Sequence, residues 1–353
     1  MSTTPLISIL RPLGALVALI ATLAAPSRAD VYRQYVGSAG AGRIMHLSVI
    51  YSGRSVDGFF EFVADSPVQP AVQSLTGTLI GHTLSVNATD SDTGNVSLKV
   101  RATFDRSPTA DDTVELKGRL IDMGGDEWPL DLRQVPFGPT VGAIVTKELK
   151  RHGDRRHEFD YEAKFPQITG VKYAAFNGAV RAAIASCSKE NLTYFTSDVN
   201  LPIPGINPSN YFDITYTIQE FTPHFASIDF HLYLDTGAAH PNMNDVTFNY
   251  DLDNNQVVSL GDVFAAGASY LHEVAVRTIA VLAKNNDLEY DEIVRGASTS
   301  AANYGVWSLT RWGLTFTFNA YQVGAYAVGP QQVWFPLKSL DLSSRADRLL
   351  AER

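Results

Sequence analysis

Apolar and polar residues alternate over short stretches in the first part of the chain, from Tyr32 to about Leu132. Residues 44–51 and 56–63 alternate on either side of the turn Ser52-Gly53-Arg54, which favours a β-hairpin. Further short alternating or apolar stretches follow at residues 75–79, 83–86, 96–104 and 114–121. Turn residues recur about every 8–12 positions and no helical period interrupts them. The pattern therefore predicts an antiparallel β meander that closes into a small barrel or a sandwich.

The second part of the chain mixes helical and strand periods. Phe176, Val180 and Ile184 are spaced four apart within residues 173–186, which predicts a helix with one buried face. A second helix is expected over residues 269–284, with Ser269 as its N-cap. Alternation predicts three hairpins, over residues 211–234, 246–258 and 307–318. The predicted fold class is α+β, in which an N-terminal antiparallel β meander precedes an α+β domain of antiparallel sheet with two packed helices.

The first residues are typical of a secretory leader. Arg11 precedes an apolar run from Leu13 to Ala25, which is too short to span a bilayer. Ser27-Arg28-Ala29 offers the small residues that signal peptidase needs, so we expect residues 1–29 to be a signal peptide, cleaved after Ala29. The mature protein is expected to be periplasmic or extracellular, with no membrane span after cleavage.

The remaining chain is expected to form two domains, over residues 30–140 and 145–345, because residues 129–139 are rich in proline and glycine. The 353-residue chain carries a formal net charge of −9, which disfavours nucleic acid as a partner. Cys187 is the one cysteine, so no intrachain disulfide forms. We expect it to be a small buried residue at the end of the first helix.

Several motifs of the second part are similar to a known family. The stretches that carry the likeness are Phe165-Pro166-Gln167, Tyr233-Leu-Asp-Thr-Gly237-Ala-Ala-His240-Pro241-Asn242, Thr247-Phe248-Asn249, Leu260-Gly-Asp262-Val-Phe264 and Leu314 to Pro330. Together they resemble the domains that precede the catalytic domain in PdaC-type peptidoglycan deacetylases. The same paired domains form the ectodomain of RsiV-like anti-sigma factors, which sense lysozyme by binding it. The resemblance covers residues 159–340 and implies a non-catalytic extracytoplasmic domain.

Two positions depart from the family's signature loop, in which a strand ends in Tyr-Glu-Val-Gly-Pro-Tyr-Ala-x-Gly. The family's glutamate is Gln322 here, and its proline is Ala325. The first departure removes a carboxylate, so no acid–base mechanism is expected on that loop.

The sequence offers no complete catalytic or metal motif. Thr103-Phe104-Asp105-Arg106 resembles the Thr-Phe-Asp-Asp motif of metal-dependent deacetylases but has arginine at the second aspartate, and no His-x-x-x-His pair accompanies it. Residues 251–262 have the oxygen-ligand spacing of a calcium loop, although Gln256 stands where glycine is needed. A hairpin turn explains the same residues, and the sequence leaves calcium binding there open. We expect no catalytic residue, metal or cofactor.

Four residues are candidate ligand contacts: His240, Asn242, Tyr321 and Tyr326. His240 and Asn242 flank Pro241 after a run of small residues, and the two tyrosines flank Gly324 in an irregular loop. Each set has a structural alternative, since a histidine before proline often ties a loop to backbone and the tyrosines can close a core.

The function expected from these observations is a non-enzymatic binding protein of the bacterial cell envelope. Its partner would be peptidoglycan, or another envelope glycan, or a lysozyme-like protein. Two alternatives stay open from the residues alone. One is a glycan-acting hydrolase with carboxylates from distant strands, and the other is a structural module that docks another envelope protein.

Overall fold

The computed structural model describes residues 31–40, 43–63, 73–89, 96–105, 114–139, 142–154, 157–197, 210–266 and 269–351. The expected leader, residues 1–29, lies outside the described residues. None of the described helices is long and apolar enough to cross a membrane.

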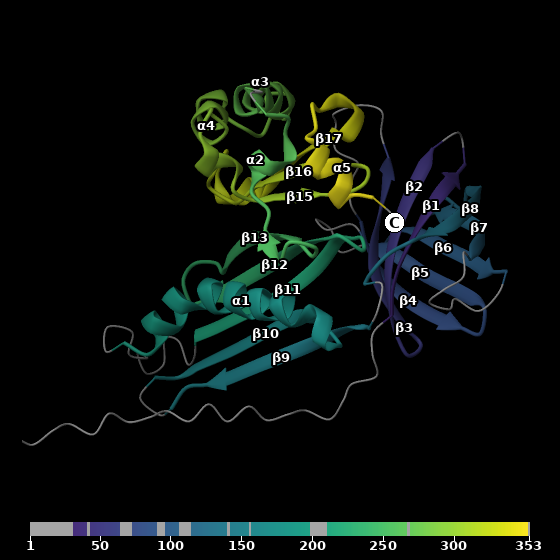
Figure 1. Ribbon diagram of the computed structural model, residues 1–353, viewed down its shortest axis with the longest axis horizontal. Coiled ribbons are helices and arrows are strands. Elements are labelled where there is room, and N and C mark those ends of the chain that lie inside the picture. The colour runs from purple at the N-terminus through teal and green to yellow at the C-terminus, as the bar shows by residue number, and fades with distance from the viewer. Residues whose placement is uncertain are drawn as a thin grey trace, which may run out of the picture.

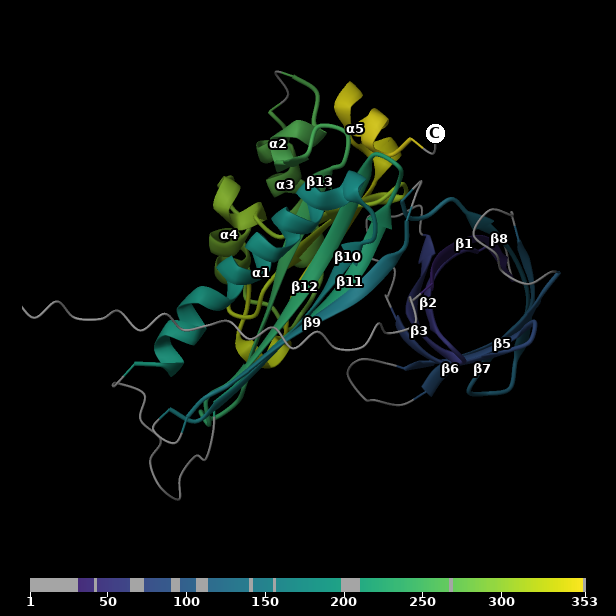
Figure 2. The ribbon, with the colours of Figure 1, turned by 60° about the horizontal axis from the view of Figure 1, so that its bottom comes forward.

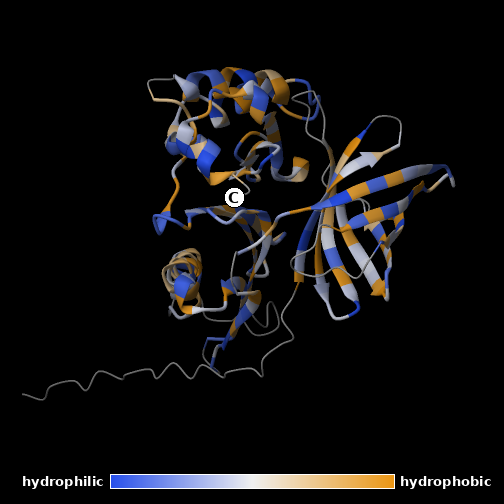
Figure 3. Cartoon of the chain, turned by 45° about the vertical axis from the view of Figure 1, so that its right-hand side comes forward, coloured by the Kyte–Doolittle hydropathy of each residue, from blue (hydrophilic) through white to orange (hydrophobic). Residues whose placement is uncertain are grey.

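The first part is a closed barrel of antiparallel strands (Figures 1 and 2). Its strands are β1 (Val31–Ala39), β2 (Ile44–Ser52), β3 (Ser55–Val63), β4 (Gln73–Ile80), β5 (Thr83–Thr89), β6 (Val96–Phe104), β7 (Glu115–Asp122) and β8 (Glu127–Val135). Each strand pairs with the next, and β8 returns to pair with β1. Alternate residues such as Leu47, Val49 and Leu132 fill the interior, and the same alternation is visible as bands of colour along the strands in Figure 3. The predicted meander is therefore a barrel rather than a sandwich.

A six-stranded sheet follows, with strand order β14-β13-β12-β11-β10-β9. The bounds are β9 (Ile144–His152), β10 (Phe159–Ile168), β11 (Asn210–Phe221), β12 (Phe225–Asp235), β13 (Asn242–Asp251) and β14 (Gln256–Val257). The helix α1 (Ala174–Phe195) packs Phe176, Val180 and Ile184 onto this sheet, as predicted. The strands β10 and β11, which α1 separates along the chain, pair in parallel, as a helical crossover allows, and the other neighbours are antiparallel.

A smaller layer covers part of the other face of this sheet. It contains a three-stranded sheet of β15 (Trp307–Leu309), β16 (Gly313–Phe318) and β17 (Gln331–Pro336), and the helices α2 (Leu260–Val263), α3 (Tyr270–Leu282), α4 (Tyr290–Gly296) and α5 (Ser344–Leu349). These elements enclose a second apolar core, which includes Phe316, Phe318 and Phe335. The 3₁₀ turn Tyr326–Val328 lies in the long connection from β16 to β17.

The barrel is joined to the sheet through its first strand and through the connection from β8 to β9. Tyr32 on β1 shares a hydrogen bond between hydroxyls with Tyr216 on β11, and Gln34 donates to the Gln219 carbonyl. Phe137 stacks on Tyr32 and meets the edge of Phe221. Tyr32 is therefore part of the apolar core of the sheet although it belongs to a barrel strand.

Two local expectations differ from the structure. The first helix continues to Phe195, so Cys187 lies inside α1 rather than at its end. Cys187 is half-buried against the sheet core, and burial raises the pKa of its thiol. Ser269 does occupy the N-cap of α3, but its side chain makes no capping hydrogen bond.

Candidate functional site

Three of the four candidate residues meet on one side of the α+β part. His240 lies in the connection from β12 to β13, while Tyr321 and Tyr326 lie in the connection from β16 to β17. The His240 ring stacks on the Tyr326 ring, with centroids 3.6 Å apart and planes 16° apart. The Tyr321 hydroxyl lies 3.2 Å from His240 Nε2, and its ring centroid is 5.5 Å from that of Tyr326. We call these three residues the aromatic cluster.

Backbone carbonyl contacts fix the orientation of the cluster. The Tyr326 hydroxyl donates to the Pro241 carbonyl over 2.6 Å, and His240 Nδ1 lies 3.0 Å from the same oxygen. Since a carbonyl only accepts, the hydrogen bond assigns the proton to Nδ1. In the neutral imidazole Nε2 then accepts from the Tyr321 hydroxyl. His240 thus ties its loop to the backbone, which was the structural alternative for this residue. It also contacts both tyrosines.

Asn242, the fourth candidate, stands apart from the other three. It is exposed at the first position of β13, where it pairs with Leu234. None of the described hydrogen bonds joins its side chain to the aromatic cluster.

The backbone at Tyr321 adopts a conformation that is unusual for a side chain of this size. Its φ is +70°, in the left-handed region that favours glycine. The surrounding loop holds it there: Asn319 exchanges two hydrogen bonds with the backbone of Asp245 on β13, at 2.8 and 3.0 Å. Strained positions of this kind persist where neighbouring contacts determine them and are concentrated at functional sites. Tyr321 is therefore 59% exposed on a loop that hydrogen bonds fix in place.

The departure at Gln322 has a structural reason. Its side-chain amide donates to the carbonyls of Gly296 and Asn303, at 3.0 and 2.9 Å. A carboxylate at this position has no proton to donate and would face two acceptors. At the second departure, Ala325 has φ −65°, which a proline also adopts. Glutamine at position 322 is therefore suited to this chain's own loop. The backbone at Ala325 has a conformation that the family's proline could also adopt.

Three other histidines each pair with an aspartate outside the aromatic cluster. His224 Nδ1 lies 2.9 Å from Asp253, and His231 Nδ1 lies 2.7 Å from Asp245. His152 pairs with Asp160 in the charged region before α1. Within the described ranges, no three His, Cys, Asp or Glu side chains are grouped so that they could hold one metal ion.

The turn with calcium-like spacing is occupied by arginines from the C-terminal helix. Asp251 accepts hydrogen bonds from Arg348 at 2.7 Å and from Arg345 at 3.3 Å. Burial alone would raise the pKa of Asp251, but the bonds from Arg348 and Asn254 lower it to about 2. Asp262 forms a capping box with Ser259 and pairs with Arg345. A hairpin turn that pins α5 explains these carboxylates, and a cation there would have to displace two guanidinium groups.

The deacetylase-like stretch is at the end of a barrel strand. Asp105 accepts a hydrogen bond from the backbone N–H of Glu115, 3.1 Å away, and Arg106 lies outside the described residues. Thr103 is exposed on β6.

A hollow lies between the barrel and the sheet, with a volume of about 490 Å³. None of the four candidate ligand contacts lines it. Its walls come from strands that are far apart in the chain, so no local motif marks it.

A comparison with known protein families finds a match in the C-terminal part of the chain. Residues 261–338, which include Tyr321 and Tyr326, match the family described as "Protein of unknown function (DUF3298)". A stretch of 126 residues is 28% identical to "Peptidoglycan-N-acetylmuramic acid deacetylase PdaC" of Bacillus subtilis (strain 168), and covers 35% of this chain. The match spans about a quarter of PdaC, 27% of its length.

Two solved structures of DUF3298 proteins also match. One, from Bacteroides fragilis, is 19% identical with a TM-score of 0.40, and the match covers 58% of this chain and 95% of that one. The other, from Pseudomonas aeruginosa, is 17% identical with a TM-score of 0.40, and covers 61% of this chain and 99% of that one. The resemblance predicted from the motifs is confirmed: this chain carries a PdaC-like region of unknown function that matches the DUF3298 family over residues 261–338.

Proposed function

We propose that the chain is a non-enzymatic binding protein of the bacterial cell envelope and that the aromatic cluster contacts its ligand. The similarity to part of PdaC, which by its name acts on peptidoglycan, supports an envelope role. The expected leader over residues 1–29 supports a place outside the cytoplasm. The chain shares only a segment with PdaC, so deacetylation is not carried over.

The observation that carries the proposal is the exposed ring of Tyr321, which lies on a loop fixed by hydrogen bonds. A tyrosine ring offers an apolar face and a polar edge, and few rotatable bonds are frozen when it is covered. A sugar ring presents matching features, an apolar face of C–H groups and an edge of hydroxyls. The ligand that fits this surface best is an envelope glycan, with Tyr321 against the sugar ring and Tyr326 supporting His240 behind it.

Sedimentation with purified peptidoglycan tests this function. We expect the wild-type protein to pellet with the polymer and Tyr321→Ala to bind about 10-fold more weakly or worse, as for truncation of a contact hot spot. Tyr290→Ala is the matched control, because Tyr290 is 61% exposed on α4 and outside the cluster. A wild-type protein that stays in the supernatant, or equal loss in both variants, would contradict the proposal.

A lysozyme-like enzyme is the second candidate partner. The net charge of −9 suits a basic protein, and exposed tyrosines are frequent at the centre of protein interfaces. Binding to immobilised lysozyme at low and high salt separates the contribution of net charge from that of the tyrosine contact. A specific complex should persist in part at high salt, and Tyr321→Ala should weaken it. Adsorption by charge alone should disappear at high salt and should be unchanged by that substitution.

A further inference from the structure

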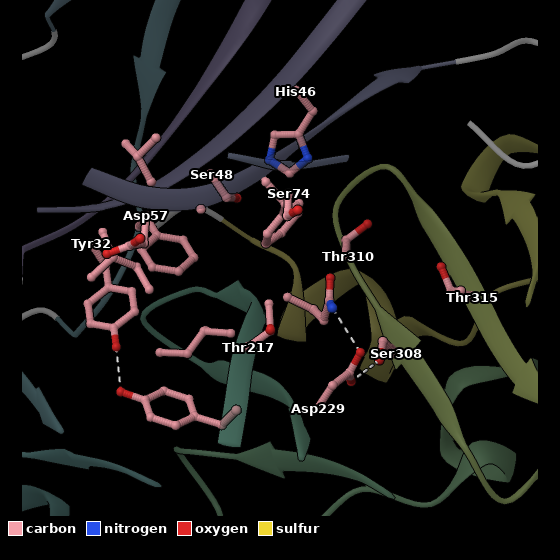
Figure 4. A pocket seen from close by; sticks show the side chains of 18 of the residues that line it. Tyr32, His46, Ser48, Asp57, Ser74, Thr217, Asp229, Ser308, Thr310 and Thr315 are labelled. Carbon is pink, nitrogen blue, oxygen red and sulfur yellow. Dashed lines mark hydrogen bonds between the residues drawn. The ribbon is translucent and has the colours of Figure 1, made fainter. Parts of the chain in front are cut away.

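The hollow of about 490 Å³ lies between the outer surface of the barrel and the strands of the α+β part (Figure 4). One wall comes from β1, β2, β3 and β4 of the barrel. The opposite wall comes from β11 and β12 of the larger sheet and from β15 to β17 of the smaller one. Its volume falls within the roughly 300–1,000 Å³ typical of small-molecule sites. We call this hollow the junction cleft.

The barrel wall of the junction cleft carries a buried hydroxyl without a partner. Ser48 on β2 is only 7% exposed, and its Oγ makes no hydrogen bond within the described structure. Buried polar atoms are nearly always bonded, and an exception calls for a ligand, an ion or a water that completes it. In Figure 4 Ser48 faces the space between the two walls, with Ser74 and Asp57 nearby.

The opposite wall presents polar groups that are already held in place. Asp229 on β12 accepts hydrogen bonds from Ser308 on β15 and, over 2.8 Å, from Gln219 on β11. Directly across the strand pair from Asp229 lies Thr217, whose Oγ1 is 2.9 Å from His231 Nε2. His231 is fixed in turn by Asp245, 2.7 Å from its Nδ1. Side chains fixed in this way lose little freedom when a ligand binds, which favours affinity.

His231 occupies only one side of the Thr217 hydroxyl. Burial alone would lower the pKa of His231, but the Asp245 carboxylate outweighs burial and raises it. A hydroxyl both donates and accepts, so the contact with His231 Nε2 uses one of these functions and leaves the other for a ligand. These three side chains therefore position the Thr217 hydroxyl on the wall of the cleft.

The remaining lining combines aromatic rings with charges of both signs. Phe59 on the barrel side and Trp334 on β17 supply apolar surface, while Arg33 and Asp57 contribute one charge of each sign. A nucleotide or other phosphate compound would require a predominance of cations. A ligand without net charge, with several hydroxyls around an apolar face, matches a lining of serine, threonine and glutamine interspersed with rings.

We propose that the junction cleft is a second ligand site, separate from the aromatic cluster, and that it binds a short uncharged saccharide. Hydroxyls of the sugar bond Ser48 on one wall and Thr217 on the other, and its apolar face lies against the aromatic lining. The sugar thereby bridges barrel and sheet. This assignment does not depend on the proposed function, because the two sites share no residue.

Titration with three uncharged disaccharides, N,N′-diacetylchitobiose, cellobiose and maltose, tests the site, with ligand-observed NMR for detection and calorimetry for affinity. We expect at least one of them to bind saturably and to be recovered unhydrolysed. Ser48→Ala and Thr217→Val should each weaken that binding about 3–10-fold, the effect of one hydrogen bond. Ser48→Ala should also raise the melting temperature of the free protein, because it removes a buried unsatisfied hydroxyl.

Two control variants show whether the saccharide binds in the junction cleft itself. Thr215→Val lies two residues from Thr217 on β11, does not line the cleft, and should bind the saccharide like the wild type. Tyr321→Ala should also keep this binding even where it loses peptidoglycan. The inference is overturned if none of the disaccharides binds at millimolar concentration. It is equally overturned if Ser48→Ala and Thr217→Val leave the affinity unchanged, or if Tyr321→Ala abolishes binding of the disaccharide.

Discussion

Glu220 and Arg311 form a buried ion pair that connects all parts of the fold. The Glu220 side chain is fully buried, and that of Arg311 is 9% exposed. The guanidinium donates to both carboxylate oxygens, at 3.0 and 2.9 Å, and the Arg311 backbone N–H adds a third bond at 3.0 Å. Arg311 also donates to the Pro136 carbonyl after the last barrel strand. One side chain in the turn between β15 and β16 thus contacts the sheet and the barrel connection.

Arg311→Met should destabilise the protein by about 3–5 kcal/mol, because Glu220 is left as an uncompensated buried charge. The measurement is the free energy of unfolding from urea denaturation. Adding Glu220→Gln to Arg311→Met removes that charge and should recover a large part of the loss. Arg295→Met, in an exposed pair with Glu292, should change stability by no more than about 0.5 kcal/mol. Equal effects of the two arginine variants would contradict this role for Arg311.

Asp229 makes the stability depend on pH near neutrality. Burial raises its pKa to about 6, although the hydrogen bond from Ser308 lowers it in part. The folded protein therefore holds this proton more tightly than the unfolded chain. The associated stability is present below pH 4 and is lost as the pH rises through 6.

Asp229→Asn should remove this part of the pH dependence. Relative to its value at pH 4, the unfolding free energy of the wild type should fall by up to about 3 kcal/mol more than that of the variant by pH 7. Asp251, with a pKa of about 2, stays ionised over this range and does not obscure the comparison. Urea unfolding at pH 4, 5, 6 and 7 provides the data, and parallel curves for the two proteins would show that folding does not raise the pKa of Asp229.

At the scale of the element, the connection from β16 to β17 depends on Gln322. Its amide bridges the end of α4 and the 3₁₀ turn Ala301–Tyr304 through the Gly296 and Asn303 carbonyls. Gln322→Glu should destabilise the fold by about 2 kcal/mol at pH 7, because two donors are replaced by an anion that faces two acceptors. Lowering the pH should recover part of this, since a neutral carboxyl can donate one hydrogen bond.

Thermal unfolding at pH 7 and pH 4 is the measurement for Gln322→Glu. Gln256→Glu on β14 is the control, because its exposed side chain makes no described hydrogen bond. A Gln322→Glu protein that melts like the control at both pH values would show that the loop does not rely on this amide.

The elements that could be predicted are those whose burial follows a local period. The barrel strands and the hairpin of β11 and β12 alternate cleanly, and α1 shows its inward face at Phe176, Val180 and Ile184. The end of α1 was missed because polar residues such as Lys189 and Glu190 interrupt that face before Phe195 buries it again. The helix α4 spans two turns, too short for a period to be recognised. Parallel pairing of β10 with β11 is a property of tertiary packing, which no local pattern specifies.

At the scale of the whole molecule, the candidate site also combines features that a local pattern predicts with features that only tertiary packing produces. His240, Tyr321 and Tyr326 were predictable as unusual residues in irregular segments, but their contact was not. It depends on β13 and on Asn319, which reach each other across 74 residues of sequence. The junction cleft could not be predicted from the sequence. Ser48 and Thr217 look like ordinary strand residues until the barrel is placed against the sheet.

The barrel and the sheet share apolar packing, so we expect them to unfold as one unit. Tyr32, from the barrel, is 6% exposed within the core of the sheet, and Phe137 lies between it and Phe221 with centroid distances of 6.4 and 6.2 Å. Phe137→Ala removes a ring that packs barrel strand β1 onto the core of the sheet, and it leaves the interior of the barrel untouched. Scanning calorimetry should then show one transition for the wild type and two for the variant.

Phe62→Ala is the matched control for this test. Phe62 is also half-buried, but it packs within the barrel against Phe60 and under the Arg43 guanidinium. Its loss should lower the melting temperature while keeping a single transition, because the contact between barrel and sheet is untouched. Two transitions in the wild-type protein would show that the packing around Phe137 is too weak to couple the two parts. In that case a ligand in the junction cleft, bonded to both walls, should merge the two transitions by stabilising the assembled state alone.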